Sequence, residues 1–233
     1  MIDRKQTEHF KVEKNRYNEH LLFNPPKHTQ EEVKTIIKEL RNRHVHTVVE
    51  FGSGNGRLTI PLLQHNIRVI AVDISKASLK ALSEAASRMK IEKGLLSTSQ
   101  TIPNNRNEAI VGCDILHHVD LDTYLGEMNQ KLSKSKGVII FSEPNILNIF
   151  WPLFITLFID WRVEWRILYC NYLTLREKLE LYHFKNIRIS GFGLFPLPLF
   201  NTLPFLQGIN YFLGNVPVLK LFAYRFIIIA ETR

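Results

Sequence analysis

Residues Val48 to Gly56 read VVEFGSGNG, a short apolar run followed by three glycines in alternate positions. Such a run predicts a buried strand that turns sharply at the glycines and continues into a helix. Glycine suits this turn because it lacks a Cβ, so the chain can bend and a ligand can approach the main chain. The loop is neither the dinucleotide fingerprint GxGxxG, because Arg57 replaces its last glycine, nor a P-loop, since no Gly-Lys-Ser/Thr follows. The glycine spacing therefore disfavours a nicotinamide dehydrogenase.

An acidic residue ends the next apolar run. Residues 69–75 read VIAVDIS, which predicts a second strand with Asp73 at its tip. A carboxylate in this position can accept hydrogen bonds from both hydroxyls of a ribose. The glycine loop and Asp73 together predict a site for a nucleoside-containing ligand.

The rest of the chain alternates between the two periodicities. Helices are expected at residues 29–43, 58–65, 75–90 and 121–132, with Ser75 as a cap and with Glu31 and Glu32 in the first turn of the first helix. Strands are expected at residues 47–51, 68–72, 94–96, 109–113, 137–142, 186–191 and 226–231. This alternation predicts an α/β fold, a parallel sheet with helices on both faces. We expect residues 1–233 to form one domain, with residues 1–28 as an N-terminal cap segment.

Two apolar segments, residues 144–174 and 192–225, interrupt the alternation. Both follow predicted strands, and both are broken by prolines or are too short to predict a membrane-spanning helix. We expect them to form a hydrophobic lid over the ligand site. A second interpretation is a contact with the membrane surface through residues 144–166 and 192–219, made by aromatic and arginine side chains.

The composition leaves several partners open. The net charge is +8, which attracts nucleic acid, anionic lipid or acidic small molecules by the same long-range field. Lys and Arg are scattered, and the sequence contains no recognisable RNA-binding module, so nucleic acid is the less favoured partner. Two cysteines form no disulfide framework, and the polar N-terminal residues do not resemble a signal peptide. We expect a cytoplasmic protein, which would be peripheral at the membrane under the second interpretation of the apolar segments.

Four stretches resemble the serial motifs of class I S-adenosylmethionine-dependent methyltransferases of the small-molecule or lipid type, with a methyltransferase type 11-like domain. They are VVEFGSGNGRLTIPLL, VIAVDIS, AIVGCDILHHV and GVIIFSEPN, in the family's order and spacing between residues 29 and 145. The resemblance implies S-adenosyl-L-methionine as cofactor. It also implies a Rossmann-like sheet of seven strands, mostly parallel, in which the last strand is antiparallel.

The resemblance also implies roles for individual residues. Glu50 and the backbone of Gly52 to Gly56 would hold the methionine moiety, Asp73 the ribose, and Ile74 the adenine. Thr98 and Ser99, on the loop after the third strand, would face the adenine amino group, although the family often has Asp in place of Thr98. Cys113 and Asp114 would lie under the sulfonium. The implied cofactor site comprises Glu50, Phe51, Gly52, Ser53, Gly54, Gly56, Asp73, Ile74, Thr98, Ser99, Cys113 and Asp114.

Methyl transfer needs an aligned acceptor and, for some acceptors, a base. Candidate catalytic groups are His117 and His118, which follow the fourth strand, and Glu143 at the end of the fifth. We favour His117 as the freer ring, since a packing or capping role is common at the position of His118 in the family. The sequence contains no Asn-Pro-Pro-Tyr element and no convincing metal-ligand spacing, so neither base amine methylation nor a bound metal is predicted.

Three functions follow, in order of preference. The first is methylation, at oxygen, of a small or lipid-like hydrophobic acceptor that the apolar segments would bury. The second is methylation of tRNA or rRNA, which the positive charge favours. The third is a catalytically silent scaffold that keeps the fold and binds a partner through its apolar segments. The oligomeric state cannot be read from the sequence.

Overall fold

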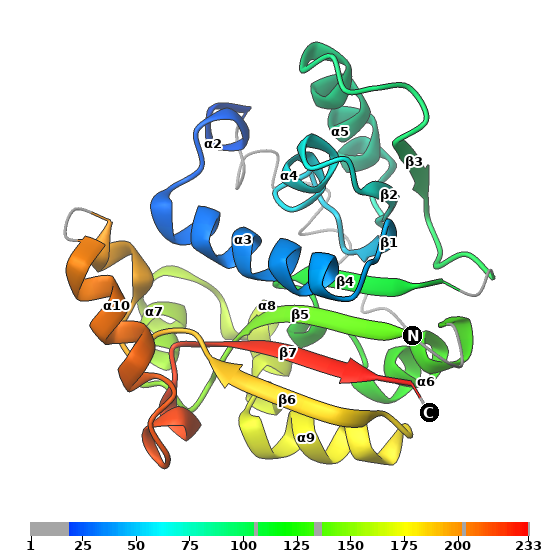
Figure 1. Ribbon diagram of the computed structural model, residues 1–233. Helices are drawn as coiled ribbons and strands as arrows, with labels where there is room; N and C mark the ends of the chain where they lie inside the picture. Colours follow the sequence, from blue (N-terminus) through cyan, green and yellow to red (C-terminus); the bar gives the residue numbers. More distant parts are fainter. Residues whose placement is uncertain (1–18, 105–106, 133–136, 202–203, 233) are drawn as a thin grey trace.

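A seven-stranded sheet forms the centre of the molecule (Figure 1). The computed structural model describes residues 19–104, 107–132, 137–201 and 204–232. The strands are β1 Thr47–Phe51, β2 Arg68–Val72, β3 Leu96–Ser99, β4 Ala109–Cys113, β5 Val138–Pro144, β6 Lys185–Gly191 and β7 Arg225–Glu231. Their order is β3-β2-β1-β4-β5-β7-β6, and β7 runs antiparallel to both of its neighbours while all other pairs are parallel. The predicted fold class is confirmed.

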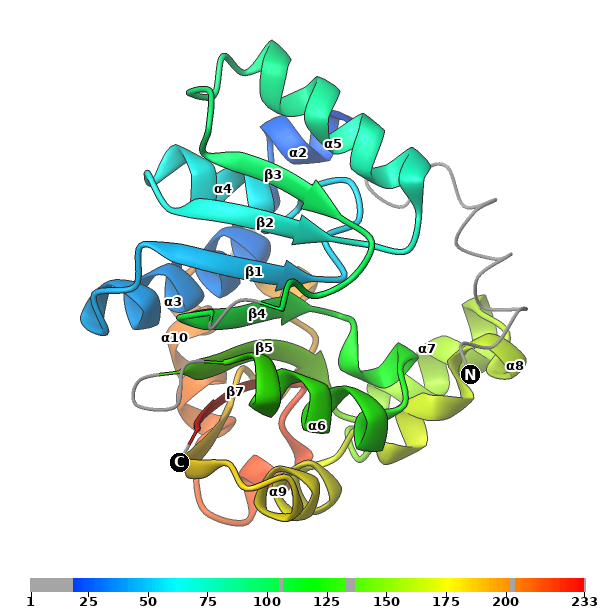
Figure 2. The same ribbon diagram turned by 90° about the vertical axis from the view of Figure 1, so that its right-hand side faces the viewer.

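Helices cover both faces of the sheet. They are α3 Lys27–Asn42, α4 Thr59–Gln64 and α5 Lys76–Arg88 on one face, and α6 Leu121–Lys131 and α9 Tyr172–Leu181 on the other. In Figure 2, α6 and α9 lie in front of the sheet and α3 and α4 behind it. Adjacent strand residues alternate between the two layers, so Val48 packs on the α3 side and Val49 on the α6 side.

The two apolar segments form further short helices. Residues 144–174 contain α7 Phe150–Phe158, α8 Trp161–Glu164 and the 3₁₀ turn η2 Trp165–Tyr169, and residues 192–225 contain η3 Leu197–Phe200, α10 Pro204–Leu213 and η4 Leu219–Phe222. Two other short elements are α2 Glu19–Phe23 and η1 Leu116–His118. The expected N-terminal cap, residues 1–28, lies mostly outside the described residues. In the part of the chain that the structure describes, each helix is too short or too polar to cross a membrane.

Two predicted boundaries differ from the structure in ways that affect the site. Strand β3 begins at Leu96 rather than Gly94, because Gly94 has a φ of +92° and belongs to the preceding turn. Thr98 and Ser99 therefore lie within β3 instead of on the loop that follows it. Helix α3 begins at Lys27, directly after Pro26, so Glu32 lies in its second turn and is buried rather than exposed near the helix dipole.

Candidate active site

One cavity of about 610 Å³ opens at the carboxyl ends of β1, β2 and β4. This edge of a parallel sheet is where ligands bind in α/β folds, because the loops that follow the strands meet there. The lining includes Phe51, Gly52, Ser53, Gly54, Arg57, Asp73, Ile74, Gln100, Thr101, Ile102, Cys113, Asp114, His117, His118, Glu164, Trp151, Phe154 and Ile155. The cavity thus joins the glycine loop to the histidines after β4 and to helix α7.

The glycine loop is hydrogen-bonded to the neighbouring strand β2, and part of its backbone is uncovered on the side that faces the cavity. The amides of Gly52 and Ser53 donate to the carbonyl oxygen of Val72 at 2.8 and 3.0 Å. Gly52 has a φ of +74°, and a Cβ there would lie 2.5 Å from Cγ1 of Ile115. Gly54 has a φ of +50°, yet a Cβ there would meet no atom within 4 Å. Glycine is thus required at position 52 by packing, and at Gly54 the backbone borders open space.

Asp73 lies beside this bare main chain, as the sequence predicted. Its carboxylate accepts hydrogen bonds from the amides of Gly54 and Ser75, both at 2.8 Å. Burial raises the pKa of Asp73, and these two N–H donors oppose the rise. Ile74 follows with 40% of its surface exposed in the cavity wall. A carboxylate and an apolar side chain therefore stand together next to the loop.

Four residues expected at the cofactor, Thr98, Ser99, Glu50 and Gly56, do not line the cavity. Thr98 is exposed on β3, and the hydroxyl of Ser99 donates to the carbonyl oxygen of Thr101, so Gln100 to Ile102 form this wall instead. Glu50 is buried behind the loop, where it accepts a hydrogen bond from the Thr59 hydroxyl at the start of α4. Burial raises the pKa of Glu50 to about 8. Its carboxyl group therefore contacts the start of α4 rather than the cavity.

Gly56 also lies outside the cavity lining. A Cβ there would lie 2.5 Å from Cδ1 of Leu82, so this glycine lets α5 pack against the loop. Cys113 does line the cavity. Burial raises the pKa of its thiol well above the ordinary value, so the thiol is neutral and unsuited to nucleophilic attack.

Four charged residues form a network at the base of the cavity: Glu32 and Arg225 are buried, whereas Arg57 and Asp114 line the cavity. Of the four, only Asp114 was predicted as a site residue. Arg57 forms ion pairs with Glu32 and Asp114. Arg225, at the start of β7, contacts the same two carboxylates at 3.0 and 2.7 Å. The two arginines lower the pKa of both carboxyl groups against the effect of burial, that of Asp114 to far below its usual range. Because its charge is neutralised, Asp114 is a structural anchor of this wall rather than a free base.

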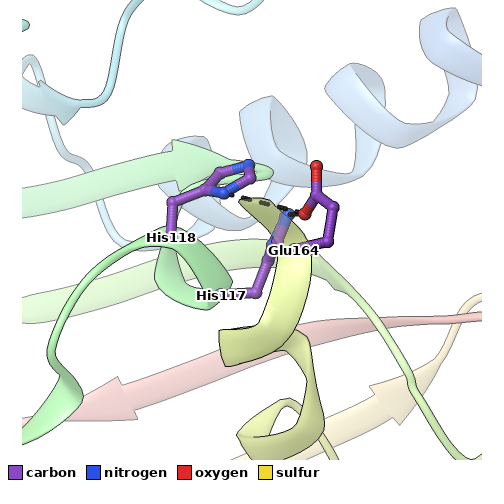
Figure 3. A group of neighbouring side chains, drawn as sticks. All are labelled: His117, His118 and Glu164. Carbon is purple, nitrogen blue, oxygen red and sulfur yellow. Dashed lines mark ion pairs between the residues drawn. The ribbon is translucent and has the colours of Figure 1, made fainter. Parts of the chain in front are cut away.

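Two further carboxylates surround the histidines after β4. His117 and His118 belong to η1, Glu143 to β5 and Glu164 to the end of α8. Nδ1 of His117 lies 2.6 Å from Oε2 of Glu143, whose Oε1 accepts from the amides of Ile115 and Leu116, both at 2.9 Å. Figure 3 shows both rings turned toward Glu164, whose Oε2 lies 3.7 Å from Nε2 of His117 and 3.8 Å from Nδ1 of His118.

This arrangement corrects the expectation that His117 is the freer ring. His117 is 7% exposed and held by Glu143, which is fully buried. Burial lowers the pKa of His117, but the hydrogen bond and charge of Glu143, together with Glu164, raise it overall. Glu164, which reaches the histidines from the first apolar segment, was not predicted as a site residue.

Helix α7 supplies an apolar wall of the cavity. Trp151, Phe154 and Ile155 line it. The indole N–H of Trp151 donates to the carbonyl oxygen of Tyr224 at 2.7 Å, and its ring stacks on that of Tyr224 at 5.0 Å. These contacts tie α7 to Tyr224, the residue that precedes β7, so the first apolar segment is fixed over the strand ends.

Comparisons with known proteins agree with this geometry. Residues 48–135 match the model of a family described as a methyltransferase domain. No curated protein matches the sequence. Similar solved structures include a SAM-dependent methyltransferase from Archaeoglobus fulgidus, 17% identical with a TM-score of 0.54, covering 86% of this chain and 94% of that one. The methyltransferase domain of bacterial CtHen1-C is 14% identical with a TM-score of 0.59, covering 88% and 99%. Phosphoethanolamine N-methyltransferase 2 of Haemonchus contortus, in complex with S-adenosyl-L-methionine, is 13% identical with a TM-score of 0.61, covering 96% and 60%.

Proposed function

We propose that the chain is a class I S-adenosylmethionine-dependent methyltransferase that methylates a small or lipid-like hydrophobic acceptor at an oxygen atom. The single observation that carries this proposal is the continuity of the cavity. One space is lined by the glycine loop and Asp73, by the histidines after β4, and by the apolar side of α7. Cofactor, proton acceptor and apolar acceptor can therefore meet in one cavity.

The glycine loop and Asp73 fit the adenosyl part of the cofactor. Bare main chain at Gly54 borders open space, which leaves room for the methionine portion beside Gly52 to Gly54. Asp73 is already fixed by two amides and offers its remaining lone pairs to the ribose hydroxyls. Ile74 provides an apolar contact for the adenine, and Gln100, which donates to the Ile74 carbonyl at 3.0 Å, replaces Thr98 and Ser99 in this wall.

The opposite end of the cavity fits an apolar acceptor with a hydroxyl group. When bound, the cofactor supplies an electrophilic methyl group on its sulfonium. Trp151, Phe154 and Ile155 exclude water from the acceptor and orient it by apolar contact. His117 and His118 offer ring nitrogens that can hold the hydroxyl and take up its proton, and Glu143 fixes the orientation of His117.

A transfer assay with labelled cofactor tests this function. Purified protein is incubated with phenolic small molecules, an apolar lipid extract, and total tRNA and rRNA in separate reactions. We expect label in the apolar pools and, after mass spectrometry, a methyl ether or ester. Label confined to RNA would overturn the proposed acceptor. A protein that binds no cofactor in calorimetry would instead support the silent scaffold.

Two phenylalanines on α7 allow a matched test of the acceptor wall. Phe154 lines the cavity, whereas Phe158 lies one turn later, is 73% exposed and does not line it. We expect Phe154→Ala to lower kcat/KM for the apolar acceptor about 10-fold, since a lost apolar contact costs about 1.5 kcal/mol. Cofactor affinity should not change, and Phe158→Ala should leave kcat/KM near the wild-type value. Equal effects of the two substitutions would contradict an acceptor site beneath α7.

The outer side of α7 supports a contact with an anionic membrane surface. Ile149, Leu153 and Leu157 recur every four residues and are 74%, 53% and 61% exposed. Exposed Arg162 follows the helix, and the net charge of the chain is +8. An apolar helix face beside positive charge is typical of helices that lie in the headgroup region. Such a contact would bring the cavity to a lipid-like acceptor.

Vesicle flotation at low salt tests the contact. We expect wild-type protein to float with vesicles that contain phosphatidylserine and to remain in solution with purely zwitterionic ones. Leu153→Ser combined with Leu157→Ser should reduce flotation and leave cofactor binding intact, because neither residue lines the cavity. Wild-type protein that stays in solution with both kinds of vesicle would refute the membrane contact.

A further inference from the structure

We propose that His117, His118 and Glu164 bind one divalent transition-metal ion, of the type of Zn²⁺, at the acceptor end of the cavity. No metal was predicted from the sequence, because the three side chains come from two distant segments and show no metal-ligand spacing. The structure brings their ligand atoms within 4.8 Å of one another. The role given to the ion rests on the proposed function, whereas the binding itself does not.

The ligand set and its spacing suit such an ion. Two imidazoles and one carboxylate are the protein ligands of many catalytic zinc sites, which keep a fourth position open. Tetrahedral ligands at about 2.1 Å from the metal lie about 3.4 Å apart. Oε2 of Glu164 lies 3.7 Å from Nε2 of His117 and 3.8 Å from Nδ1 of His118, so these two distances are within a few tenths of an ångström of that spacing.

Glu143 gives His117 the orientation that a metal ligand needs. The short contact between its Oε2 and Nδ1 of His117 assigns the ring proton to Nδ1, which leaves the lone pair of Nε2 directed toward Glu164 (Figure 3). Two backbone amides hold the other oxygen of Glu143 in turn. A carboxylate that orients a ligating histidine is the usual outer shell of a zinc site.

The charges of the cluster also favour a cation. Two carboxylates, Glu143 and Glu164, flank His117, and both are almost completely buried, at 0% and 4% exposure. A divalent ion between Glu164 and the two rings would balance this buried negative charge.

The open side of the cluster faces the acceptor. His117, His118 and Glu164 all line the cavity, next to Phe154 and Ile155. A hydroxyl at the fourth position would have a lowered pKa and would release its proton to water at neutral pH. Its oxygen then forms the bond to the methyl group while the bond from sulfur to that methyl group breaks and its electron pair stays on sulfur. The ion thus takes over the proton removal that the bare histidines would perform.

Calorimetric titration of Zn²⁺ alone into chelator-treated, dialysed protein tests the site, without cofactor or acceptor. We expect one ion per chain, and a Co²⁺-substituted sample should show the visible absorption of a four-coordinate ion. His118→Ala and Glu164→Gln should each weaken binding by at least 10-fold, and Glu143→Gln by about 10- to 100-fold through loss of orientation. His65→Ala is the control, since His65 is exposed on α4's C-terminal side and should leave the titration unchanged.

Two outcomes separate this proposal from the proposed function. Binding of Zn²⁺ that is unaffected by both His118→Ala and Glu164→Gln, or no binding by folded wild-type protein, would overturn the metal site. In that case methyl transfer that persists in the presence of chelator would leave the proposed function standing. Stoichiometric binding that depends on these residues, without transfer to any acceptor, would support the metal site and count against the proposed function alone.

Discussion

Arg225→Met is expected to lower the free energy of unfolding by about 3–5 kcal/mol, the usual cost of removing one partner from a buried ion pair. Arg225 is 7% exposed, and Glu32, its partner on α3, is 2% exposed. Methionine has a similar length but no charge, so Glu32 and Asp114 would keep only Arg57 as a cation. The guanidinium also donates to the carbonyl oxygen of Ser142 at 3.2 Å, and that acceptor would lose a donor in the interior.

Urea unfolding of the variant measures this effect, and an exposed arginine provides the control. Arg188 pairs with Glu39, but 53% of its side chain is exposed, so Arg188→Met should cost less than about 1 kcal/mol. The double variant Glu32→Gln with Arg225→Met should lose less than the sum of the two single changes, because the charges that face each other are removed together. Equal losses for Arg225→Met and Arg188→Met would contradict a buried network.

The network also predicts a dependence of stability on pH. Burial would raise the pKa of Glu32, but the two arginines lower it below its ordinary value of 4.5. A carboxyl group with a lowered pKa in the folded state stabilises the protein above its ordinary pKa and loses this contribution as the pH falls. The difference in melting temperature between wild type and Arg225→Met should therefore have its full size at pH 7. It should become smaller as the pH falls below about 4.5.

Asp73→Ala is expected to weaken cofactor binding by about 1.5–3 kcal/mol for each hydrogen bond that the carboxylate makes to the ribose, or about 10- to 150-fold per bond. Asp73→Asn should have an intermediate effect, because the amide oxygen can still accept one bond. Asp122→Asn is the control, since Asp122 pairs with Lys178 on the surface and does not itself line the cavity. Calorimetry with S-adenosylhomocysteine gives the affinities, and unchanged affinity in Asp73→Ala would place the ribose elsewhere.

The sheet and the first half of the site could be predicted because their signals are local. The apolar runs of β1, β2, β4, β5 and β7 appear in the sequence as buried strands, and the glycine loop and Asp73 end two neighbouring strands. The sequence of β3 indicates a strand less clearly. This strand lies at the edge of the sheet, and Ser97 and Thr98 are exposed, so the boundary predicted from apolar residues was two residues early. That error moved Thr98 and Ser99 off the strand.

The second half of the site depends on contacts between distant elements. Glu32, Arg57 and Arg225 come from α3, the glycine loop and β7, and nothing in their local sequence indicates that they share one network. Glu164 reaches His117 only because α8 folds back over η1. A hint was available in position 57, where an arginine follows the loop in place of a glycine. For Glu50, burial against Thr59 could not be distinguished from contact with the cofactor.

A crystal structure with S-adenosylhomocysteine bound tests the central claim most directly. We expect both ribose hydroxyls within about 2.6–3.2 Å of the carboxylate oxygens of Asp73. The homocysteine portion should lie along Gly52 to Gly54, and its sulfur should point toward His117. A nucleoside bound outside this crevice, or a ribose that leaves Asp73 untouched, would contradict the account.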